Sequence, residues 1–231
     1  MAHHCNGIEC RIGRPKGVEN LSAHDNASSR IGRRPATTKD DIAAVGLRLF
    51  AARGFDDTSI DDIADAAGIA RRTFFRYFAS KNAVPWGDFD THLEGMRALL
   101  ADLPSDATLA EGLTEALLEF NTFPDDQAAI HRTRMRLILT VPTLQGYSMV
   151  MYEGWRDVIA EYVARRTGSR PGDHVPRTAA WIVLAIGISS YEHWLADDTQ
   201  QLEDLLRAGA AILTGGIAAL LDSSNVGSWS S

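Results

Sequence analysis

The sequence predicts an all-α fold, with an N-terminal three-helix domain that contains a helix-turn-helix and a larger C-terminal helical domain. Apolar residues recur every three or four positions along most of the 231-residue chain, which is the spacing of one helix face. Proline or glycine breaks separate the helical stretches, as at Phe123-Pro124, Val141-Pro142 and the 168–176 loop. No alternating strand pattern extends beyond a few residues.

A first helix is expected from about residue 38 to residue 53. Thr38 and Asp41 are three residues apart and can cap its start. Its inner stripe is formed by four apolar residues at helical spacing: Ile42, Val45, Leu49 and Phe50. Gly54 is expected to end this helix, and Phe55 to pack in the corner that follows.

The next two helices are short and have the pattern of a helix-turn-helix. Ser59 and Asp62 can cap the first of them, and Gly68 can adopt the left-handed conformation that ends it, with Ile69 filling the corner. The second helix is expected from about residue 71 to residue 78. Its residues Phe74 and Phe78 lie four apart and should face the core.

The exposed side of that second helix is predicted to be basic. No acidic residue occurs between Asp65 and Asp88, so the cationic side chains there are Arg71, Arg72, Arg76 and Lys81. Such side chains attract phosphates, and arginine can bind guanine edges. The net charge of −7 does not exclude nucleic acid, because the basic groups are local. The residues themselves leave open an ordinary helical hairpin with a solvated charged face.

The flanking residues strengthen the helix-turn-helix interpretation. The run from Ile42 to Ile60, followed by Ile63-Ala64, Ala67-Gly68-Ile69 and residues 73–81, closely resembles the N-terminal domain of TetR-family transcriptional regulators over about residues 38–84. Residues 134–144 and 152–156 are similar to actinobacterial members, including regulators associated with mycofactocin gene clusters. The resemblance implies a ligand-relieved repressor that binds a palindromic double-stranded DNA operator as a homodimer.

The resemblance also implies a division of the chain. Residues 1–36 would form a disordered arm, residues 37–83 the DNA-binding domain, residues 84–221 a helical ligand-binding and dimerisation domain, and residues 222–231 a disordered tail. Helices are expected at about 81–103, 108–121, 125–140, 142–167, 177–196 and 200–221, with Pro85 either starting the first of these near Val84 or kinking it. The last two helices would pair with their copies in a second subunit, the alternative being burial within one chain.

DNA contacts are expected from the second helix of the motif and from the arm. Arg71 and Arg72 would contact base edges, Thr73, Tyr77 and Lys81 would contact phosphates, and Phe75 and Arg76 would contact the groove. Arg33 and Arg34 would enter the minor groove, unless the arm is only a solvated tail. Two positions depart from the family pattern: Phe75 stands where many members have Tyr, and Ala70 where Ser or Thr is common.

A ligand pocket is expected among the middle helices, which carry large, adaptable or amphipathic side chains. The candidates are Met96, Phe120, His131, Arg132, Met135, Arg136, Tyr147, Met151, Trp155 and Tyr191. Arg132 and Arg136 lie four residues apart and could bind a carboxylate or phosphate at the pocket mouth, although a solvated face is the simpler explanation. A small apolar or amphipathic effector of acyl type fits this composition, and plain core packing is the alternative for each apolar candidate.

Other classes of function find little support in the sequence. It has no nucleophile elbow, phosphate-binding glycine loop or metal-ligand motif, so we expect no catalytic residue, metal site or cofactor. Cys5 and Cys10 are too few for a disulfide scaffold. No apolar run reaches the ~20 residues of a membrane span, which predicts a cytoplasmic, nucleoid-associated protein without membrane contact. The alternatives are a helical ligand-binding or interaction protein without DNA binding and, more distantly, a helical-bundle enzyme.

Overall fold

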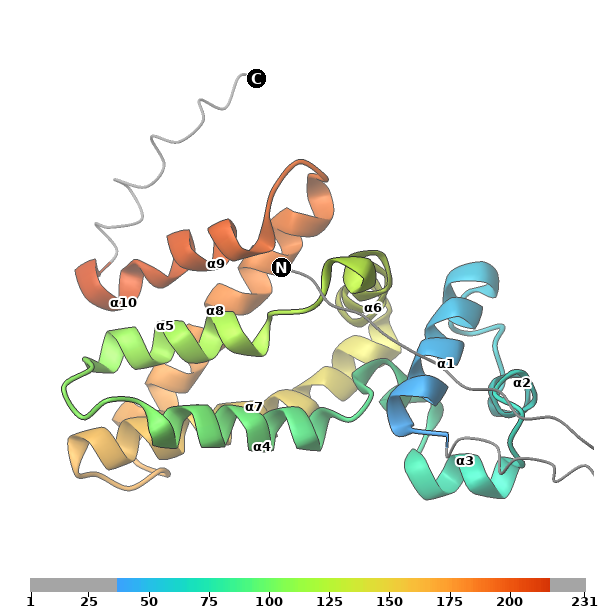
Figure 1. The fold of residues 1–231 in the computed structure, drawn as a ribbon, viewed down its shortest axis with the longest axis horizontal. Coiled ribbons are helices and arrows are strands. Elements are labelled where there is room, and N and C mark those ends of the chain that lie inside the picture. The colour runs from blue at the N-terminus through green and yellow to red at the C-terminus, as the bar shows by residue number, and fades with distance from the viewer. Residues whose placement is uncertain (1–36, 217–231) are drawn as a thin grey trace, which may run out of the picture. The chain divides into compact units, whose positions relative to one another are not determined.

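The computed structural model describes residues 37–216, and within this range the fold is all-α, as predicted (Figure 1). The helix-turn-helix region contains α1 (Lys39–Arg53), α2 (Ile60–Ala66), α3 (Arg71–Tyr77) and the 3₁₀ helix η1 (Lys81–Trp86). The larger region contains α4 (Phe89–Asp102), α5 (Leu109–Phe120), η2 (Asp125–Gln127), α6 (Ala128–Thr140), α7 (Pro142–Thr167), α8 (His174–Ala196), α9 (Leu202–Ala210) and α10 (Ile212–Gly215). The predicted arm and C-terminal tail lie outside the described residues.

Capping boxes start the first two helices, as the sequence predicts. The Thr38 hydroxyl accepts a hydrogen bond from the Asp41 backbone N–H at 3.1 Å, and the Asp41 carboxylate accepts one from the Thr38 N–H at 2.9 Å. Ser59 and Asp62 repeat this arrangement at α2. Each box satisfies backbone donors that have no partner within the helix.

The turn between α2 and α3 also has the predicted geometry. Gly68 adopts φ +66°, and the Ile69 N–H donates to the Ala64 carbonyl at 2.9 Å. Phe74 and Phe78 are fully or almost fully buried. α3 begins at Arg71 without a side-chain cap, because the residue at the N-cap position is Ala70.

The buried face of α1 differs from the predicted stripe. Val45 and Leu49 are only partly buried, whereas Ala43, Gly46 and Leu47 are buried. The physical reason is close packing at Gly46, where an added Cβ atom would lie 2.5 Å from Val84 Cγ1. The absence of a side chain at Gly46 therefore lets η1 approach α1, and the buried face of the helix turns toward that contact.

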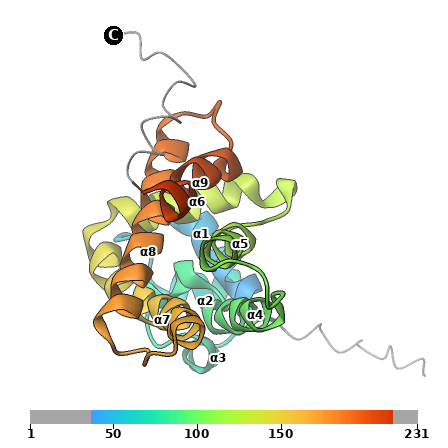
Figure 2. The same cartoon turned by 90° about the vertical axis from the view of Figure 1, so that its left-hand side faces the viewer.

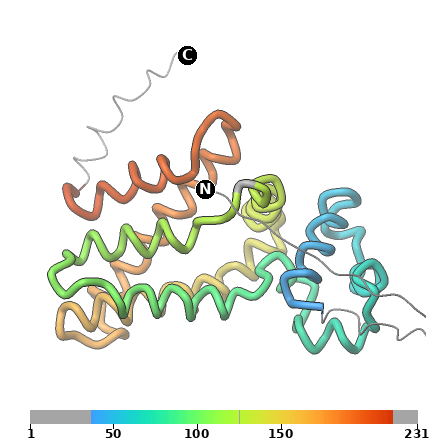
Figure 3. The backbone as a smooth tube through the Cα atoms, viewed as in Figure 1, coloured from blue at the N-terminus to red at the C-terminus, as the bar shows by residue number. Residues whose placement is uncertain are grey.

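The predicted continuous helix from residue 81 or 84 to residue 103 is wrong. Figure 3 follows the chain from α3 through η1 into α4, which begins only at Phe89. Pro85 lies inside the 3₁₀ turn, and Gly87 follows with φ +56°. Asp40 of α1 accepts a hydrogen bond from the Asp88 backbone N–H at 3.0 Å. The break is therefore fixed by a contact with α1 as well as by proline and glycine.

The larger region is built around the long helices α7 and α8, which pack against each other and diverge from the loop that joins them (Figure 2). Pro142 occupies the first turn of α7 and Gly168, at φ +67°, ends it, so its predicted bounds are confirmed. α8 starts three residues earlier than predicted, because Pro176 is accommodated in its first turn. The predicted last helix is interrupted at Ala211, and its predicted end lies outside the described residues.

The helix-turn-helix core also contains residues from α6 and α7. Leu144 is completely buried in that core, and Leu137 and Val141 pack against it. The two regions therefore share packed side chains at the α6–α7 junction as well as at η1. In the part of the chain that the structure covers, no helix combines the length and the apolarity that crossing a membrane requires.

Candidate nucleic-acid interface and internal cavity

α3 presents a basic and partly apolar outer face. Phe74 anchors this seven-residue helix in the core, while Arg72, Phe75 and Arg76 are exposed. The Phe75 ring is 46% exposed although it is apolar. Exposed arginines next to an exposed aromatic ring suit a surface that meets phosphates and base edges.

The two arginines predicted to read bases are held differently. Arg71 Nη1 lies 2.6 Å from Asp61 Oδ2, and its guanidinium lies 5.5 Å from the centre of the Phe75 ring. Both charged groups of this ion pair are more than half exposed, so the pair contributes little to stability and can exchange for a DNA contact. Arg72 forms no ion pair with any described residue.

Tyr77 and Lys81 are engaged inside the helix-turn-helix region. The Tyr77 hydroxyl donates to the Thr37 carbonyl at 2.9 Å and lies next to Arg76. Lys81 Nζ donates to the carbonyls of Phe55 and Thr58 at 2.7 and 3.0 Å. No sequence pattern predicted these contacts of Lys81, which fasten η1 to the loop between α1 and α2. Phosphate contacts at Thr73, Tyr77 and Lys81 stay predictions, and Arg33 and Arg34 lie outside the described residues.

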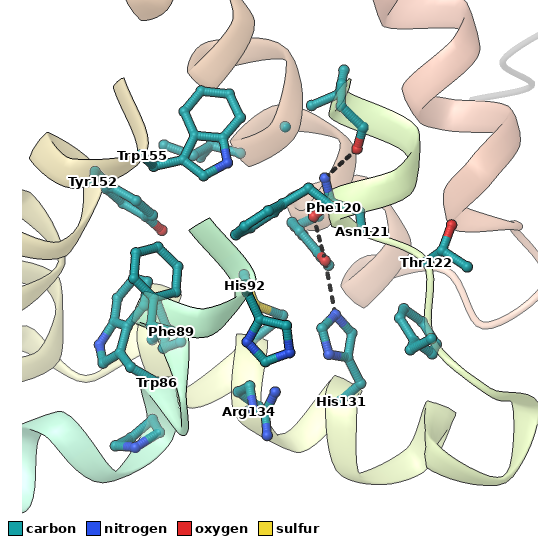
Figure 4. A pocket seen from close by; sticks show the side chains of 18 of the residues that line it. Trp86, Phe89, His92, Phe120, Asn121, Thr122, His131, Arg134, Tyr152 and Trp155 are labelled. Carbon is teal, nitrogen blue, oxygen red and sulfur yellow. Dashed lines mark hydrogen bonds between the residues drawn. The ribbon is translucent and has the colours of Figure 1, made fainter. Parts of the chain in front are cut away.

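A cavity of about 250 Å³ lies among η1, α4, α5, α6, α7 and α8. Most of its wall is aromatic and aliphatic. The Trp86 ring meets the rings of Phe89 and Tyr152 edge to face, with centroid distances of 5.0 and 5.4 Å. Phe120 makes similar contacts with Phe89 and Trp155. Figure 4 shows His92, His131 and Arg134 toward one end of the cavity and Phe120 and Trp155 toward the other. The cavity is therefore amphipathic.

A series of side-chain hydrogen bonds crosses the polar end of the cavity. Asn121 Nδ2 donates to the Leu117 carbonyl, which directs Oδ1 toward the Tyr191 hydroxyl at 2.8 Å. The single phenolic hydrogen is donated to Asn121, so His131 Nε2, also 2.8 Å away, donates to the Tyr191 oxygen (Figure 4). Burial lowers the pKa of His131 to about 3, with a smaller contribution from Arg134. Burial also raises the pKa of Tyr191. Both groups are neutral at physiological pH.

Two further donors at the cavity have no partner. Trp86 Nε1 and Arg134 Nε are buried, and neither makes a hydrogen bond within the described part of the chain. Both residues line the cavity. Buried donors are normally paired, so an acceptor that enters the cavity could pair with both groups.

The structure brings half of the predicted ligand residues to this cavity. These are Phe120, His131, Met135, Trp155 and Tyr191. Met96 is instead packed in the core, with 3% of its surface exposed. Tyr147 and Met151 are partly buried against the same core, because they lie on faces of α7 that do not reach the cavity.

The predicted pair of arginines is corrected by the structure. Arg132 Nη1 donates to the Trp194 carbonyl and the Asp198 carboxylate, both at 2.7 Å, and Arg136 is exposed. Neither lines the cavity. The arginine that does is Arg134, which the sequence analysis missed. Its signal was the helical spacing that it shares with His131 and Ile138 on one face of α6.

A helix-turn-helix with an exposed basic helix, joined to a helical bundle that encloses an amphipathic cavity, defines a class of DNA-binding regulator. Comparison with known families agrees with this assignment. The sequence model for bacterial regulatory proteins of the tetR family matches residues 42–84, and that for the MftR C-terminal domain matches residues 107–218. The chain belongs to the TetR family of transcriptional regulators.

Individual relatives support this membership. The chain is 53% identical over 189 residues to the mycofactocin biosynthesis transcriptional regulator MftR of Mycobacterium tuberculosis, a match that covers 82% of this chain and 96% of the relative. It is 28% identical to the regulator TcmR of Streptomyces glaucescens, over 70% of this chain and 75% of TcmR. The structure of FadR from Bacillus halodurans has the same fold, with a TM-score of 0.56 and 17% identity over 80% of this chain and 98% of FadR.

This membership makes the chain a DNA-binding transcriptional regulator, in preference to a helical ligand-binding protein without DNA binding. Among the described residues, no three His, Cys, Asp or Glu side chains lie close enough together to hold a metal ion.

Proposed function

We propose that the protein is a repressor that binds a palindromic operator as a homodimer and releases it when an amphipathic effector fills the cavity. The observation that carries this proposal is the outer face of α3, where Arg72, Phe75 and Arg76 are exposed while Phe74 fixes the helix in the core. A helix held in this way can enter a major groove without losing its own packing.

In this proposal the exposed residues of α3 divide the work of recognition. Arg72, which makes no ion pair among the described residues, binds a base edge, and Arg71 does so after exchanging its contact with Asp61. Phe75 has no hydroxyl group for a phosphate and instead contacts a thymine methyl. Thr73 and Tyr77 position the helix against the backbone, and Arg33 and Arg34 enter the adjacent minor groove.

The surface proposed for the second subunit lies on α7 and α8. These helices carry a set of exposed large apolar side chains: Met149, Val150, Val175, Trp181 and Ile182. The outer face of α9 is charged instead, with an ion pair between Glu203 and Arg207 at 2.7 Å. We therefore propose the dimer contact on α7 and α8 in place of the expected contact on α8 and the final helix, of which residues 217–221 lie outside the described range. A dimer presents two copies of α3 to two half-sites.

The proposed effector has an apolar body and one polar end, and an acyl-type molecule is our first candidate. The cavity is slightly smaller than the ~300 Å³ at which pockets for drug-sized ligands begin, so it suits a compact body. Its wall includes Pro85 and Trp86 of η1, and the neighbouring Val84 is completely buried in the helix-turn-helix core. An occupant that moves η1 would thus disturb the packing that orients α3.

The proposal is tested by selecting bound duplexes from a random pool and measuring affinity for the best site. Arg72→Ala should weaken binding to that site by about 5- to 150-fold and relax the preference at one base position per half-site. Arg170→Ala is the matched control, because it removes one arginine from an exposed position in the loop between α7 and α8. It should leave affinity unchanged.

Measurements at two salt concentrations separate base contacts from phosphate contacts. Removing a phosphate contact weakens binding to all duplexes alike and makes the dependence of affinity on salt concentration shallower. If Arg72→Ala lowers affinity for selected and random duplexes equally, Arg72 contacts phosphate alone. If neither the parent protein nor the Arg170→Ala control binds any duplex, the proposal fails.

A further inference from the structure

The cavity carries charge on one wall only. Arg134 of α6 lines it, and no Asp or Glu side chain is among the described residues that do so. His131 is neutral because burial lowers its pKa to about 3. The guanidinium of Arg134 therefore has no counter-ion inside the cavity. A buried cation is normally paired, because leaving it unpaired is unfavourable.

The hydrogen bonds of this wall are incomplete as well. Arg134 Nε and Trp86 Nε1 are both buried without an acceptor among the described residues, and they come from α6 and from η1. Both are donors only. The missing partner is therefore an acceptor, and one that carries negative charge would also balance Arg134. The rest of the wall, from Phe89 to Trp155, is apolar and aromatic.

We propose that Arg134 is the charge-selecting ligand contact of this protein and that it binds the carboxylate of a monocarboxylic acid with a compact apolar body. This inference rests on the proposed effector site and specifies its chemistry. A carboxylate can accept two N–H bonds from one guanidinium in a planar arrangement. The charge would also exclude amines, which a purely apolar cavity would accept.

The position of Arg134 links this contact to the DNA-binding region. α6 packs against α1, and Asp40 lies in the first turn of α1. Burial lowers the pKa of the Arg134 guanidinium, and the negative charge of Asp40 opposes that shift. Asp40 also accepts the Asp88 N–H at the start of α4. A carboxylate in the cavity would share the charge of Arg134 with Asp40, so ligand binding would weaken the attraction between α6 and α1.

The test uses four probes with the same eight-carbon chain and different ends: octanoate, octanamide, octylamine and the octanoyl thioester of coenzyme A. Binding to the free protein is measured through tryptophan fluorescence, since Trp86 and Trp155 line the cavity, and by calorimetry. Octanoate should bind at least tenfold more tightly than octanamide, and octylamine should not bind. If octanamide or octylamine binds as tightly as octanoate, the proposal is overturned. It is also overturned if the thioester is the one probe that binds.

Three variants locate the charge. Arg134→Gln should reduce octanoate affinity by about 10- to 100-fold and leave octanamide affinity unchanged, while Arg134→Lys should retain part of the octanoate affinity. Arg136→Gln, two residues further along α6 and exposed, is the matched control and should bind like the parent protein. The melting temperature of Arg134→Gln should change little, because the variant removes both the cost of burying a charge and the attraction of that charge to Asp40. Equal octanoate binding by both Gln variants would contradict the assignment.

Asp40→Asn tests the link to α1. Its amide oxygen can still accept the Asp88 N–H, so the variant removes the negative charge of residue 40 and keeps the hydrogen bond to the start of α4. It should bind octanoate several-fold more tightly, the opposite direction to Arg134→Gln, and an unchanged or weaker affinity would remove the link. These measurements use no DNA. Loss of operator release with intact octanoate binding would therefore count against the proposed function and not against the Arg134 contact.

Discussion

His131 makes the stability of the protein depend on pH in a predictable direction. Burial lowers its pKa from 6.5 to about 3 in the folded state. As the pH falls from about 6.5 toward 3, the unfolded chain binds a proton that the folded protein excludes, so the free energy of unfolding falls. The slope approaches about 1.4 kcal/mol per pH unit for one proton. His131→Gln should lose this part of the dependence.

Urea unfolding at pH 7.5, 6 and 5 measures the effect. Several carboxylates with lowered pKa values, such as Asp41 and Asp62, also destabilise the fold at low pH but are common to parent and variant. The difference between the two proteins therefore isolates His131. His174→Gln, an exposed histidine at the start of α8, is the control. Parallel pH profiles for all three proteins would mean that His131 binds its proton as readily in the folded protein as in the unfolded chain.

At the scale of single residues, the sequence predicted burial better than chemistry. Phe74 and Phe78 could be assigned to the core because their spacing of four residues puts both apolar rings on one face of a short helix. The arginines of α6 could not be ranked in this way, since Arg132, Arg134 and Arg136 alternate along the helix and only the packing of α8 and η1 decides which of them meets a cavity. Lys81 likewise has its partners in a loop more than 20 residues earlier in the chain.

The joint between η1 and α4 is the element whose geometry depends most on a single residue. Gly87 has φ +56°, and a Cβ atom there would lie 2.6 Å from Asp40 Oδ1. Gly168, at the end of α7, has φ +67° but open space around it. Gly168→Ala should therefore cost only the strain of the left-handed conformation, about 1–2 kcal/mol. Gly87→Ala should cost more, because it also displaces the acceptor of the Asp88 N–H, worth about 0.5–1.5 kcal/mol.

Equilibrium urea unfolding of both variants compares these costs. Both glycines have positive φ, but ψ is +24° at Gly168 and −138° at Gly87, so Gly87→Ala carries more backbone strain in addition to the clash with Asp40. Equal destabilisation would mean that Asp40 moves aside freely and that the contact between α1 and the start of α4 does not constrain the joint.

At the scale of elements, local signals were sufficient wherever a helix carries its own start and stop. Thr108 caps α5, Pro142 starts α7 and Gly168 ends it, and these bounds were predicted correctly. The break before α4 could be suspected from Pro85 but not placed. Its position depends on Asp40, which is 48 residues earlier in the chain, and no pattern within one helix contains that information.

At the scale of the molecule, helical periodicity predicted the class of fold and the resemblance of residues 38–84 predicted the family, but neither predicted how the two cores meet. Leu144 lies at the start of α7 and is part of the helix-turn-helix core. Its sequence neighbours are compatible with either core. The same limit applies to the surface, because the apolar residues of α8 and of the last helix look equally suited to a dimer contact until the structure shows which of them are exposed.

The dimer surface proposed on α7 and α8 leads to the last prediction. Ile182 is 42% exposed and Val150 is 63% exposed, so Ile182→Glu and Val150→Glu place a charge on the proposed contact without opening the core. A charge buried at an apolar interface is strongly unfavourable. Both variants should therefore fold normally, shift from dimer to monomer, and lose affinity for a two-half-site operator, because each monomer then presents a single α3.

Ala208→Glu is the control for this prediction. It adds the same charge to an exposed position on α9, which belongs to the alternative dimer surface formed by the last helices. Sedimentation analysis and operator binding should leave it indistinguishable from the parent protein. Because the proposed contacts with one half-site all come from one subunit, all three variants should bind a single half-site as the parent does. If Ala208→Glu is monomeric while Ile182→Glu remains a dimer, the second subunit docks on α9, and the apolar side chains of α7 and α8 must be exposed for another reason.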